Sequence, residues 1–387
     1  MRGVYGLIDV SALCCRFENV QAGGLWRNVR LLCNLAARWR SRKSVAGETG
    51  SVTDIDDLAS LLRGLGLVEP GVTVRLTPLA GGVSSDIALV EAAGRRFCIK
   101  RALPRLRVAA LWEAPVGRNA AEAAWMRAVG GWLPGAAPMV LGQDDESGLF
   151  AMEYFPPEAY ALWKAELLAG RADVDFAAAV GRDLAIIHGC SAADPSLPAA
   201  FANDETFEAI RIEPYLRATG RAHPDLSPRF EELVRITLAT RKALVHGDIS
   251  PKTILRGPNG PVFLDAECAW FGDPAFDLAF CLNHLLLKGA RSGARREPYL
   301  EAFHALAEAY MRRVTWEEPS ALEARAAALL PALFLARVDG KSPVEYLTSE
   351  VERDAVRRCA MPLIAAPPAR LSEIAEAWSK ARRAARD

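Results

Sequence analysis

The stretch ALVHGDISPKTILRGPNGPVFLD, residues 243–265, decides the fold of this chain. Short apolar runs at 244–245 and 261–264 predict two strands inside an otherwise helical region. Asp248 lies in a proline-containing loop after the first run, and Asp265 follows the second run directly. A single aspartate is an ordinary turn or cap residue. Two apolar strands that both lead into aspartate, 17 residues apart, instead indicate two acids that serve one site.

The residue types at these positions suit proton and metal binding. Asp248 is placed to accept a proton from a substrate hydroxyl, and His246 to hold the loop by hydrogen bonds. Asp265, at the end of its strand, is a carboxylate that could hold Mg²⁺ on the phosphates of ATP. The two strand ends are therefore the candidate site from which the rest of the chain is interpreted.

Toward the N-terminus, the pattern of apolar residues changes from helical to alternating. A short helix at 54–65 precedes segments of period two, which predict strands. The predicted strands are residues 72–79, 87–91, 96–100, 138–141 and 149–154, with a helix at 119–129. After residue 157 the pattern is Ala/Leu-rich and helical almost to the C-terminus. The fold class is therefore α+β, with a small antiparallel-sheet N-terminal lobe over 51–155 and a larger, mainly helical C-terminal lobe over 156–387.

A glycine-rich loop, residues 79–86, lies between the first two predicted strands. Gly81 and Gly82 let the backbone approach an anion closely, and the hydroxyls of Ser84 and Ser85 can line a phosphate. A glycine pair in a hairpin loop is more often only a turn. The loop therefore indicates a phosphate site only in combination with other features.

Lys100 ends the third predicted strand, beside apolar neighbours. A lysine against a core needs a carboxylate or phosphate partner. Glu122, on the following helix, is an available carboxylate. A surface lysine at a strand end is the alternative that the sequence leaves open.

The composition of the whole chain excludes several classes of protein. Its 387 residues are 51% hydrophobic and 24% charged, as in ordinary globular proteins. Lys and Arg (47) balance Asp and Glu (47), so no overall positive field points to nucleic acid as a partner. No uninterrupted apolar run reaches the ~18–20 residues of a membrane span. The eight cysteines form no C-x-x-C pair and favour free thiols in a reducing cytosol, so we expect a cytoplasmic protein without a membrane span.

The first fifty residues differ in charge from the rest. Residues 1–45 carry eight basic residues against two acidic ones, so the remaining chain is net acidic. The stretch 25–43 mixes Trp, Leu and Arg at roughly helical spacing, which is compatible with a surface-seeking amphipathic helix or a targeting segment. The alternative is a poorly ordered extension that ends in a linker at 44–51. We favour the extension and exclude residues 1–50 from the fold prediction.

Taken together, these residues resemble the aminoglycoside phosphotransferase/choline kinase family of the protein-kinase-like fold. The strongest match runs from His246-Gly-Asp through Phe263-Leu-Asp to the segment GDPAFDL, residues 272–278. The resemblance covers about residues 52–340. It implies a bilobal protein-kinase-like fold and ATP-dependent transfer of the γ-phosphoryl group to a hydroxyl of an aminoglycoside-, choline- or sugar-like acceptor. The cofactors that it implies are ATP and Mg²⁺.

The family pattern also implies roles for single residues. Lys100 would bind the α- and β-phosphates of ATP and pair with Glu122. Asp248 would be the catalytic base, and Asp265 would be the Mg²⁺ ligand.

Further positions follow from the same resemblance. Glu153 and Tyr154 belong to the stretch that would form the hinge, whose backbone meets adenine. His188, in the LAIIH stretch, is expected to be structural. Asp277 is expected to cap the next helix and to brace the catalytic loop.

One position departs from the family pattern. The family has an asparagine metal ligand five residues after the catalytic aspartate, where this chain has Thr253. A hydroxyl is a weaker ligand on a shorter side chain. Either the enzyme works with a weakened metal site that contains Asp265 and Thr253, or it is a nucleotide-binding pseudokinase that acts as an interaction module. The intact charged positions favour activity.

Two features disfavour a protein kinase. Ser250 stands two residues after Asp248, where kinases that phosphorylate Ser or Thr usually have lysine, although Lys252 is near. Only 11 residues separate Asp265 from Asp277, and no A-P-E motif follows. Because a peptide platform needs a longer segment, we expect a small-molecule hydroxyl acceptor as the partner.

The nature of the acceptor is less readable. The net acidity beyond the first 45 residues is compatible with a cationic acceptor, although scattered surface acids give the same count. The charged stretch 337–342 either faces the acceptor cleft or is a helix C-terminus ended by Gly340. Aromatic residues could also line a cleft, but we expect core packing for each; they are Trp112, Trp125, Tyr160 and Trp163.

Overall fold

The fold was analysed in a computed structural model, which describes residues 55–79, 85–103, 117–291 and 297–383. All of these belong to one compact unit, residues 50–387. The predicted N-terminal extension lies outside the described residues, as do Gly81, Gly82, Ser84 and Trp112.

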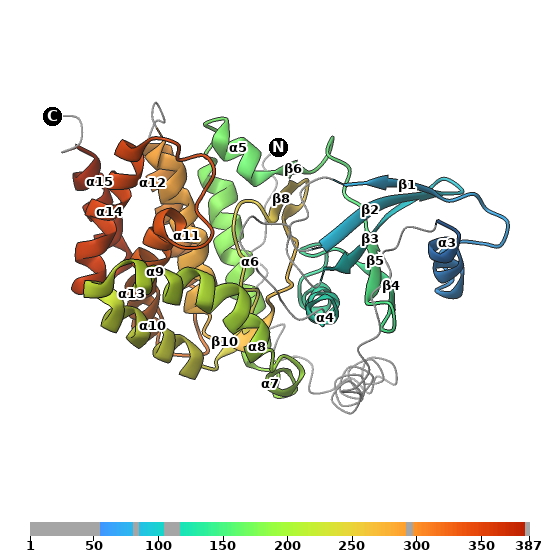
Figure 1. The fold of residues 1–387 in the computed structure, drawn as a ribbon, viewed down its shortest axis with the longest axis horizontal. Helices are drawn as coiled ribbons and strands as arrows, with labels where there is room; N and C mark the ends of the chain where they lie inside the picture. The colour runs from blue at the N-terminus through green and yellow to red at the C-terminus, as the bar shows by residue number, and fades with distance from the viewer. Residues whose placement is uncertain (1–54, 80–84, 104–116, 292–296, 384–387) are drawn as a thin grey trace, which may run out of the picture. The chain divides into compact units, whose positions relative to one another are not determined.

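A five-stranded antiparallel sheet forms the N-terminal part of the described chain (Figure 1), with strand order β1-β2-β3-β5-β4. The strands are β1 (Arg75–Pro78), β2 (Ser85–Ala92), β3 (Arg95–Ala102), β4 (Val140–Asp144) and β5 (Leu149–Glu153). The β2–β3 turn places Ala93 and Gly94 at φ values of 48° and 76°. Positive φ at both central residues matches the twist of a tight hairpin. The sheet confirms the predicted α+β class.

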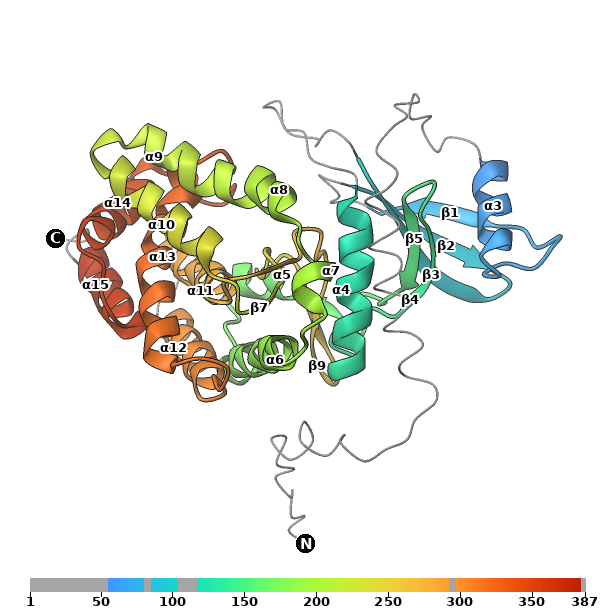
Figure 2. The same cartoon turned by 90° about the horizontal axis from the view of Figure 1, so that it is seen from below.

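The two faces of the sheet are covered by different helices, α3 (Ile55–Gly64) and α4 (Arg118–Trp132), as Figure 2 shows. Side chains alternate between faces along a strand. Phe97 and Ile99 of β3 pack in a core with Leu58 of α3. Lys100 lies on the opposite face, where it meets Glu122 of α4. The alternation of β3 thus directs a lysine toward the helix that supplies its carboxylate.

The chain after residue 160 is mainly helical, as predicted. Its α-helices are α5 (Trp163–Leu168), α6 (Val174–Ala192), α7 (Leu197–Ala200), α8 (Asp204–Phe207), α9 (Ala218–Ala222), α10 (Ser227–Ala239), α11 (Ala275–Ala290), α12 (Glu297–Met311), α13 (Pro319–Asp339), α14 (Glu350–Ala365) and α15 (Leu371–Arg383). A π-helix, η2 (Glu208–Arg217), and a 3₁₀ turn, η3 (Pro224–Leu226), complete this part.

Helix α11 runs through the centre of the main hydrophobic core. Every residue from Ala275 to Ala290 is buried, including the polar Asn283, His284 and Lys288. A helix that is apolar on all sides is a core helix. The polar residues of α11 are therefore surrounded by protein.

Short strands hold the loop between the predicted acids. Strands β7 (Ala243–Val245) and β10 (Trp270–Gly272) pair antiparallel, and β8 (Ile254–Gly257) lies between β6 (Ala161–Leu162) and β9 (Gly260–Phe263). Strands β6 and β10 were not predicted, because two or three residues are too few to show a period of two. Core packing of Trp125 and Trp163 is confirmed, since both are at most 1% exposed.

Two further findings concern the whole described part. No helix there is both long and apolar enough to cross a membrane. Within the described ranges, four cysteines are buried free thiols: Cys98, Cys268, Cys281 and Cys359.

Candidate active site

The loop that carries Asp248 begins where the buried strand β7 ends, and a carboxylate of helix α11 holds the backbone of this loop. Asp277 accepts the N–H of His246 at 2.7 Å and the N–H of Gly247 at 2.8 Å. Its Oδ2 also lies 3.2 Å from Nε2 of His188, whose Nδ1 is 2.7 Å from the hydroxyl of Tyr310. These contacts confirm that Asp277 braces the loop and that His188 is structural. The predicted helix cap is wrong, because Asp277 lies inside the first turn of α11, and it is Asp273 that accepts the N–H of Ala275, at 3.0 Å.

Gly247 gives the loop a conformation that other residues rarely adopt. Its φ is +79°, and a Cβ at this position would lie 2.7 Å from the Cβ of Cys268 and 3.0 Å from its carbonyl oxygen. The left-handed backbone and the close approach both require glycine.

We expect Gly247→Ala to destabilise the fold by at least about 2 kcal/mol, because it adds left-handed strain to a steric overlap. Urea unfolding followed by circular dichroism measures this loss. The control is Gly131→Ala in helix α4, where a Cβ meets nothing within 4 Å and the helix gains up to about 1 kcal/mol. Equal unfolding midpoints for the wild type and Gly247→Ala would contradict the expectation.

His246 connects the loops that carry the two acids. Its Nε2 lies 3.0 Å from the carbonyl oxygen of Leu264, and its Nδ1 accepts the N–H of Asp248 at 3.1 Å. Burial lowers the pKa of His246, so the ring is neutral with its proton on Nε2. The ring of Trp125 meets it edge-on at a centroid distance of 4.8 Å. His246 thus fixes the spacing between Asp248 and Asp265, as predicted for a bracing residue.

The carboxylate of Asp248 is buried, and its two oxygens have different surroundings. Oδ2 pairs with Nη2 of Arg211 at 2.8 Å and with Nζ of Lys252 at 2.9 Å. Oδ1 is buried and has no hydrogen-bond partner in the described part of the chain. An unpartnered buried oxygen is costly, so such atoms mark places where another molecule binds. The arrangement leaves Oδ1 available to a substrate hydroxyl.

Arg211 is a site residue that sequence reasoning missed. It comes from the π-helix η2 and is 5% exposed. Its Nε donates to the carbonyl oxygen of Gly247, and its Nη2 pairs with Asp248. π-helical turns are rare and occur often at functional sites. An arginine in a helical pattern far upstream of the loop gives no local signal for this contact.

Lys100 lies between Glu122, from helix α4 beside the N-terminal sheet, and Asp265, from the mainly helical part of the chain. Its Nζ is 2.7 Å from Oε2 of Glu122 and also pairs with Asp265. Burial by itself would lower the pKa of Lys100, but the surrounding carboxylates, Asp265 first, outweigh burial and raise it. Burial raises the pKa of Glu122, against the lowering effect of Lys100. The structure therefore brings the predicted lysine, glutamate and strand-terminal aspartate together.

Asp265 has a strained backbone and a partly open carboxylate. Its φ is +66°, a left-handed value that asparagine and aspartate tolerate better than most residues. Burial alone would raise its pKa, but Lys100 and Lys252 lower it, so the group is ionised. Its side chain is 35% exposed. The carboxylate of Asp265 is therefore accessible from solvent.

Glu267 is a further carboxylate at the site, and the sequence prediction did not include it. It lies two residues after Asp265, and its Oε2 pairs with Nε of Arg118 at 2.9 Å. Its charge also acts on Lys100. Three acids therefore surround Lys100, although no group of three metal-binding side chains is already arranged for an ion in the described residues.

Thr253 uses its hydroxyl within the loop. The hydroxyl donates to the carbonyl oxygen of Asp248 at 2.6 Å and accepts the N–H of Ser250 at 3.2 Å. Thr253 therefore stabilises the turn that follows Asp248. Metal ligation by Thr253 stays a prediction, and it would compete with these contacts.

The remaining described candidates lie along the sheet. Ser85 begins β2, and its buried Oγ has no hydrogen-bond partner among the described residues. Glu153 ends β5, and its N–H donates to the carbonyl oxygen of Met139 at 2.9 Å. The guanidinium of Arg96 lies 4.6 Å from the ring centroid of Tyr154. The nucleotide-binding roles of these residues stay predictions.

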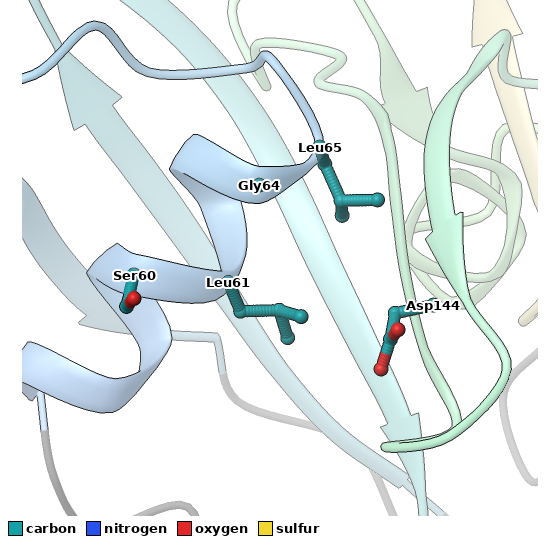
Figure 3. A pocket seen from close by; sticks show the side chains of 5 residues that line it. All are labelled: Ser60, Leu61, Gly64, Leu65 and Asp144. Atoms are coloured by element: carbon teal, nitrogen blue, oxygen red, sulfur yellow. The ribbon is translucent and has the colours of Figure 1, made fainter.

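A pocket at the end of helix α3 lies outside this constellation (Figure 3). It is lined by Ser60, Leu61, Gly64, Leu65 and Asp144. Its single carboxylate, Asp144, already accepts the N–H of Ser147 at 2.7 Å. The pocket contains none of the predicted site residues, so we assign it no chemistry.

The fold and this site define a protein of the protein-kinase-like class. A solved structure of the amicoumacin kinase hAmiN, in complex with AMP-PNP, Ca²⁺ and Ami, superposes with a TM-score of 0.52 at 15% identity. The match covers 81% of this chain and 94% of that protein. At this level of identity the likeness establishes the fold alone.

The family follows from the sequence. A family model described as the phosphotransferase enzyme family matches residues 75–316, which is more than half of the chain. The chain belongs to this family of small-molecule kinases and is a phosphotransferase. A methylthioribose kinase of Yersinia enterocolitica is 26% identical over 311 residues, or 70% of this chain and 77% of that protein. A methylthioribose kinase of Escherichia coli is 27% identical over 245 residues, or 55% of this chain and 57% of that protein.

Proposed function

We propose that this phosphotransferase transfers the γ-phosphoryl group of ATP to a hydroxyl of a small sugar-like molecule. The observation that carries the proposal is the free Oδ1 of Asp248, buried beside a loop that His246 ties to Asp265. A base for the hydroxyl and an acid for the metal are thus held at a fixed spacing. The two related methylthioribose kinases support a sugar-like acceptor.

For the nucleotide, we propose that Lys100 contacts the α- and β-phosphates and keeps its pair with Glu122. Gly81, Gly82, Ser84 and Ser85 would cover the phosphates, and Glu153 and Tyr154 would meet adenine. The buried Ser85 hydroxyl, which is still unpaired, supports this placement.

For the metal, we propose Asp265 as the principal ligand. Ionised carboxylate oxygens are what Mg²⁺ prefers, and the partly exposed Asp265 fits this requirement. Bound there, Mg²⁺ would offset the charge of the phosphate oxygens.

The proposed transfer step follows from the different surroundings of the two carboxylate oxygens of Asp248. The acceptor oxygen attacks the γ-phosphorus in line, the bond from that phosphorus to the bridging oxygen of ADP breaks, and the hydroxyl proton passes to Oδ1. Arg211 and Lys252 hold Oδ2, so the carboxylate cannot rotate away from the hydroxyl. Catalysis on this account is mostly positioning and electrostatic stabilisation.

The pseudokinase alternative depended on Thr253 at the family's asparagine position. The Thr253 hydroxyl stabilises the catalytic loop instead of leaving a gap in it. Since Lys100, Asp248 and Asp265 are all in place, no finding favours the alternative.

The test is acceptor-dependent release of ADP by the full-length protein with ATP and Mg²⁺. The panel contains methylthioribose and ribose as sugar-like alcohols, and choline and kanamycin as cationic ones. We expect turnover with sugar-like alcohols and at least tenfold lower kcat/KM with the cationic pair. Binding of ATP without turnover of any alcohol would support the pseudokinase and contradict the proposal.

A further inference from the structure

A group of buried basic side chains next to the catalytic loop has no role in the reaction described so far. It consists of His284 and Lys288 of helix α11 and Arg337 of helix α13, and we call these three residues the basic cluster. Their exposed fractions are 5%, 1% and 8%. In the described part of the chain, none of the three forms an ion pair with a carboxylate. Buried bases are normally paired, so the basic cluster calls for a physical explanation.

The hydrogen bonds of the basic cluster are also incomplete. Both ring nitrogens of His284 and Nε of Arg337 are buried without a partner among the described residues. Nη1 of Arg337 reaches the hydroxyls of Tyr215 at 3.1 Å and Ser342 at 2.8 Å. Among the described residues, Nζ of Lys288 meets Tyr346, with a long contact of 3.5 Å to its hydroxyl and a distance of 4.9 Å to its ring centroid. Several donors therefore point at no acceptor, and each costs free energy while it stays unmet.

Mutual repulsion adds to this cost. Burial, together with the positive charges of Lys164 and Arg337, lowers the pKa of Lys288 to about 7. Burial and the same positive neighbours hold the pKa of His284 well below its usual value. Glu345 raises the pKa of Lys288, but its carboxylate already pairs with Lys164. A bound anion would relieve the repulsion and satisfy the free donors at once.

Aromatic rings connect the basic cluster to the catalytic aspartate. The ring of Tyr215 lies between two guanidinium groups, 5.8 Å from that of Arg211 and 5.5 Å from that of Arg337. The ring of Phe280 is 5.3 Å from that of Tyr215 and 5.4 Å from that of His284. Because Arg211 holds Asp248, two side chains, Tyr215 and Arg211, connect Arg337 of the basic cluster to the proposed base.

Lys252 lies beside the catalytic loop and the basic cluster and is exposed to solvent. It pairs with Asp248, and its charge also acts on His284. Its side chain is 49% exposed. An acceptor that approaches from the solvent side of Lys252 would therefore meet both Asp248 and the basic cluster.

We propose that the basic cluster binds an anionic group of the acceptor, a carboxylate or a phosphate ester, while Asp248 receives the proton of its hydroxyl. This inference rests on the proposed function and narrows its acceptor to an acidic sugar-like alcohol. The local charge at the site is thus opposite to the net acidity of the chain beyond its first 45 residues, which was compatible with a cationic acceptor. The charged stretch at 337–342 is a helix C-terminus that also reaches the acceptor site through Arg337.

The first test measures anion binding without ATP. Thermal unfolding of the full-length protein is followed in sodium gluconate, sodium phosphate and sodium chloride of equal ionic strength. We expect gluconate or phosphate to raise the unfolding temperature of the wild type relative to chloride, and not that of Lys288→Met. This variant should fold, because an apolar residue in place of an unpaired buried charge is neutral or stabilising.

The matched control is Lys341→Met, just past the end of helix α13, which carries Arg337. Lys341 is 44% exposed and pairs with Glu213 at 2.7 Å, so its removal changes the net charge equally but leaves the basic cluster intact. Stabilisation by gluconate or phosphate should persist in this control. Equal stabilisation of the wild type and Lys288→Met, or stabilisation of neither, would overturn the anion site.

The second test compares acceptors that differ in one group. Ribose, ribose 5-phosphate and ribonate are offered with ATP, and release of ADP is measured. We expect one of the anionic compounds to have a KM ~10–100-fold below that of ribose, the gain for hydrogen bonds to a charged group. This advantage should disappear in Lys288→Met with the KM for ATP unchanged. The carboxylate and phosphate arms identify which anion is bound.

The two tests separate the two proposals. Stabilisation by an anion in the wild type only, with no turnover of any alcohol, would support the basic cluster and contradict the proposed function. Turnover of ribose equal to that of both anionic compounds would support phosphoryl transfer and overturn the basic cluster as an acceptor site.

Discussion

We expect Asp248→Asn to lower kcat by ~10²–10⁴-fold and to retain the affinity for ATP, because the variant loses the proposed general base. The substitution keeps the shape of the side chain, but an amide oxygen cannot take up the hydroxyl proton. Turnover with the best acceptor and direct titration of ATP measure the two parts of the expectation separately.

The surroundings of Asp248 make a folding control necessary. Arg211 and Lys252 lose their ionic partner in the variant, and removing one member of a buried pair costs about 3–5 kcal/mol. Unchanged ATP affinity and a cooperative unfolding transition would show that the variant is folded. Asp145→Asn, on the exposed turn after β4, is the matched substitution and should leave turnover unchanged. Near-normal turnover in Asp248→Asn would remove Asp248 from its catalytic role.

The second large effect is expected at Asp265. Asn is the appropriate replacement, because it tolerates the φ of +66° that most residues would strain. We expect Asp265→Asn to abolish the dependence of ATP affinity on Mg²⁺ and to lower kcat by ~10²–10⁴-fold, which corresponds to several kcal/mol of lost charge stabilisation. Titration of ATP at increasing Mg²⁺ provides the measurement.

The interpretation of that experiment depends on Lys100. Removal of the Asp265 charge frees Lys100 from one of its carboxylates while Glu122 remains. Affinity for ATP without Mg²⁺ should therefore stay the same or rise. An Mg²⁺ titration that matches the wild type would contradict the assignment of Asp265 as the metal ligand.

The sequence predicted those parts of the site that local patterns encode. Strand alternation around Lys100 and the apolar runs before Asp248 and Asp265 are each contained in a few consecutive residues. The hydrogen bonds of His246 and Asp277 followed from their positions in the same motif. The α+β class could be predicted for the same reason, since helical and alternating periods separate near residue 155.

Other parts of the site depend on contacts between distant segments. Arg211 reaches the loop of Asp248 from a π-helix. The period of 3.6 residues, which describes an α-helix, does not predict on which side of a π-helix a side chain lies. His284 and Lys288 belong to a helix that is buried on every side, so the helix has no polar face from which their position could be predicted. The two- and three-residue strands β6 and β10 are too short to carry a pattern. Such features become visible only when the packing of the helices is known.

The pairing of Lys100 with Asp265 has a consequence for the order in which ligands enter. Lys100 and Asp265 pair with each other, so on the proposed function Mg²⁺ that arrived alone would have to displace an ammonium group to bind Asp265. A nucleotide that arrived with its metal would offer both groups new partners together: phosphate oxygens for the lysine and the cation for the aspartate. Separating Lys100 from Asp265 would therefore cost less free energy when a metal–nucleotide complex binds than when the metal or the nucleotide binds alone. The ion pair would thus favour binding of the preformed complex.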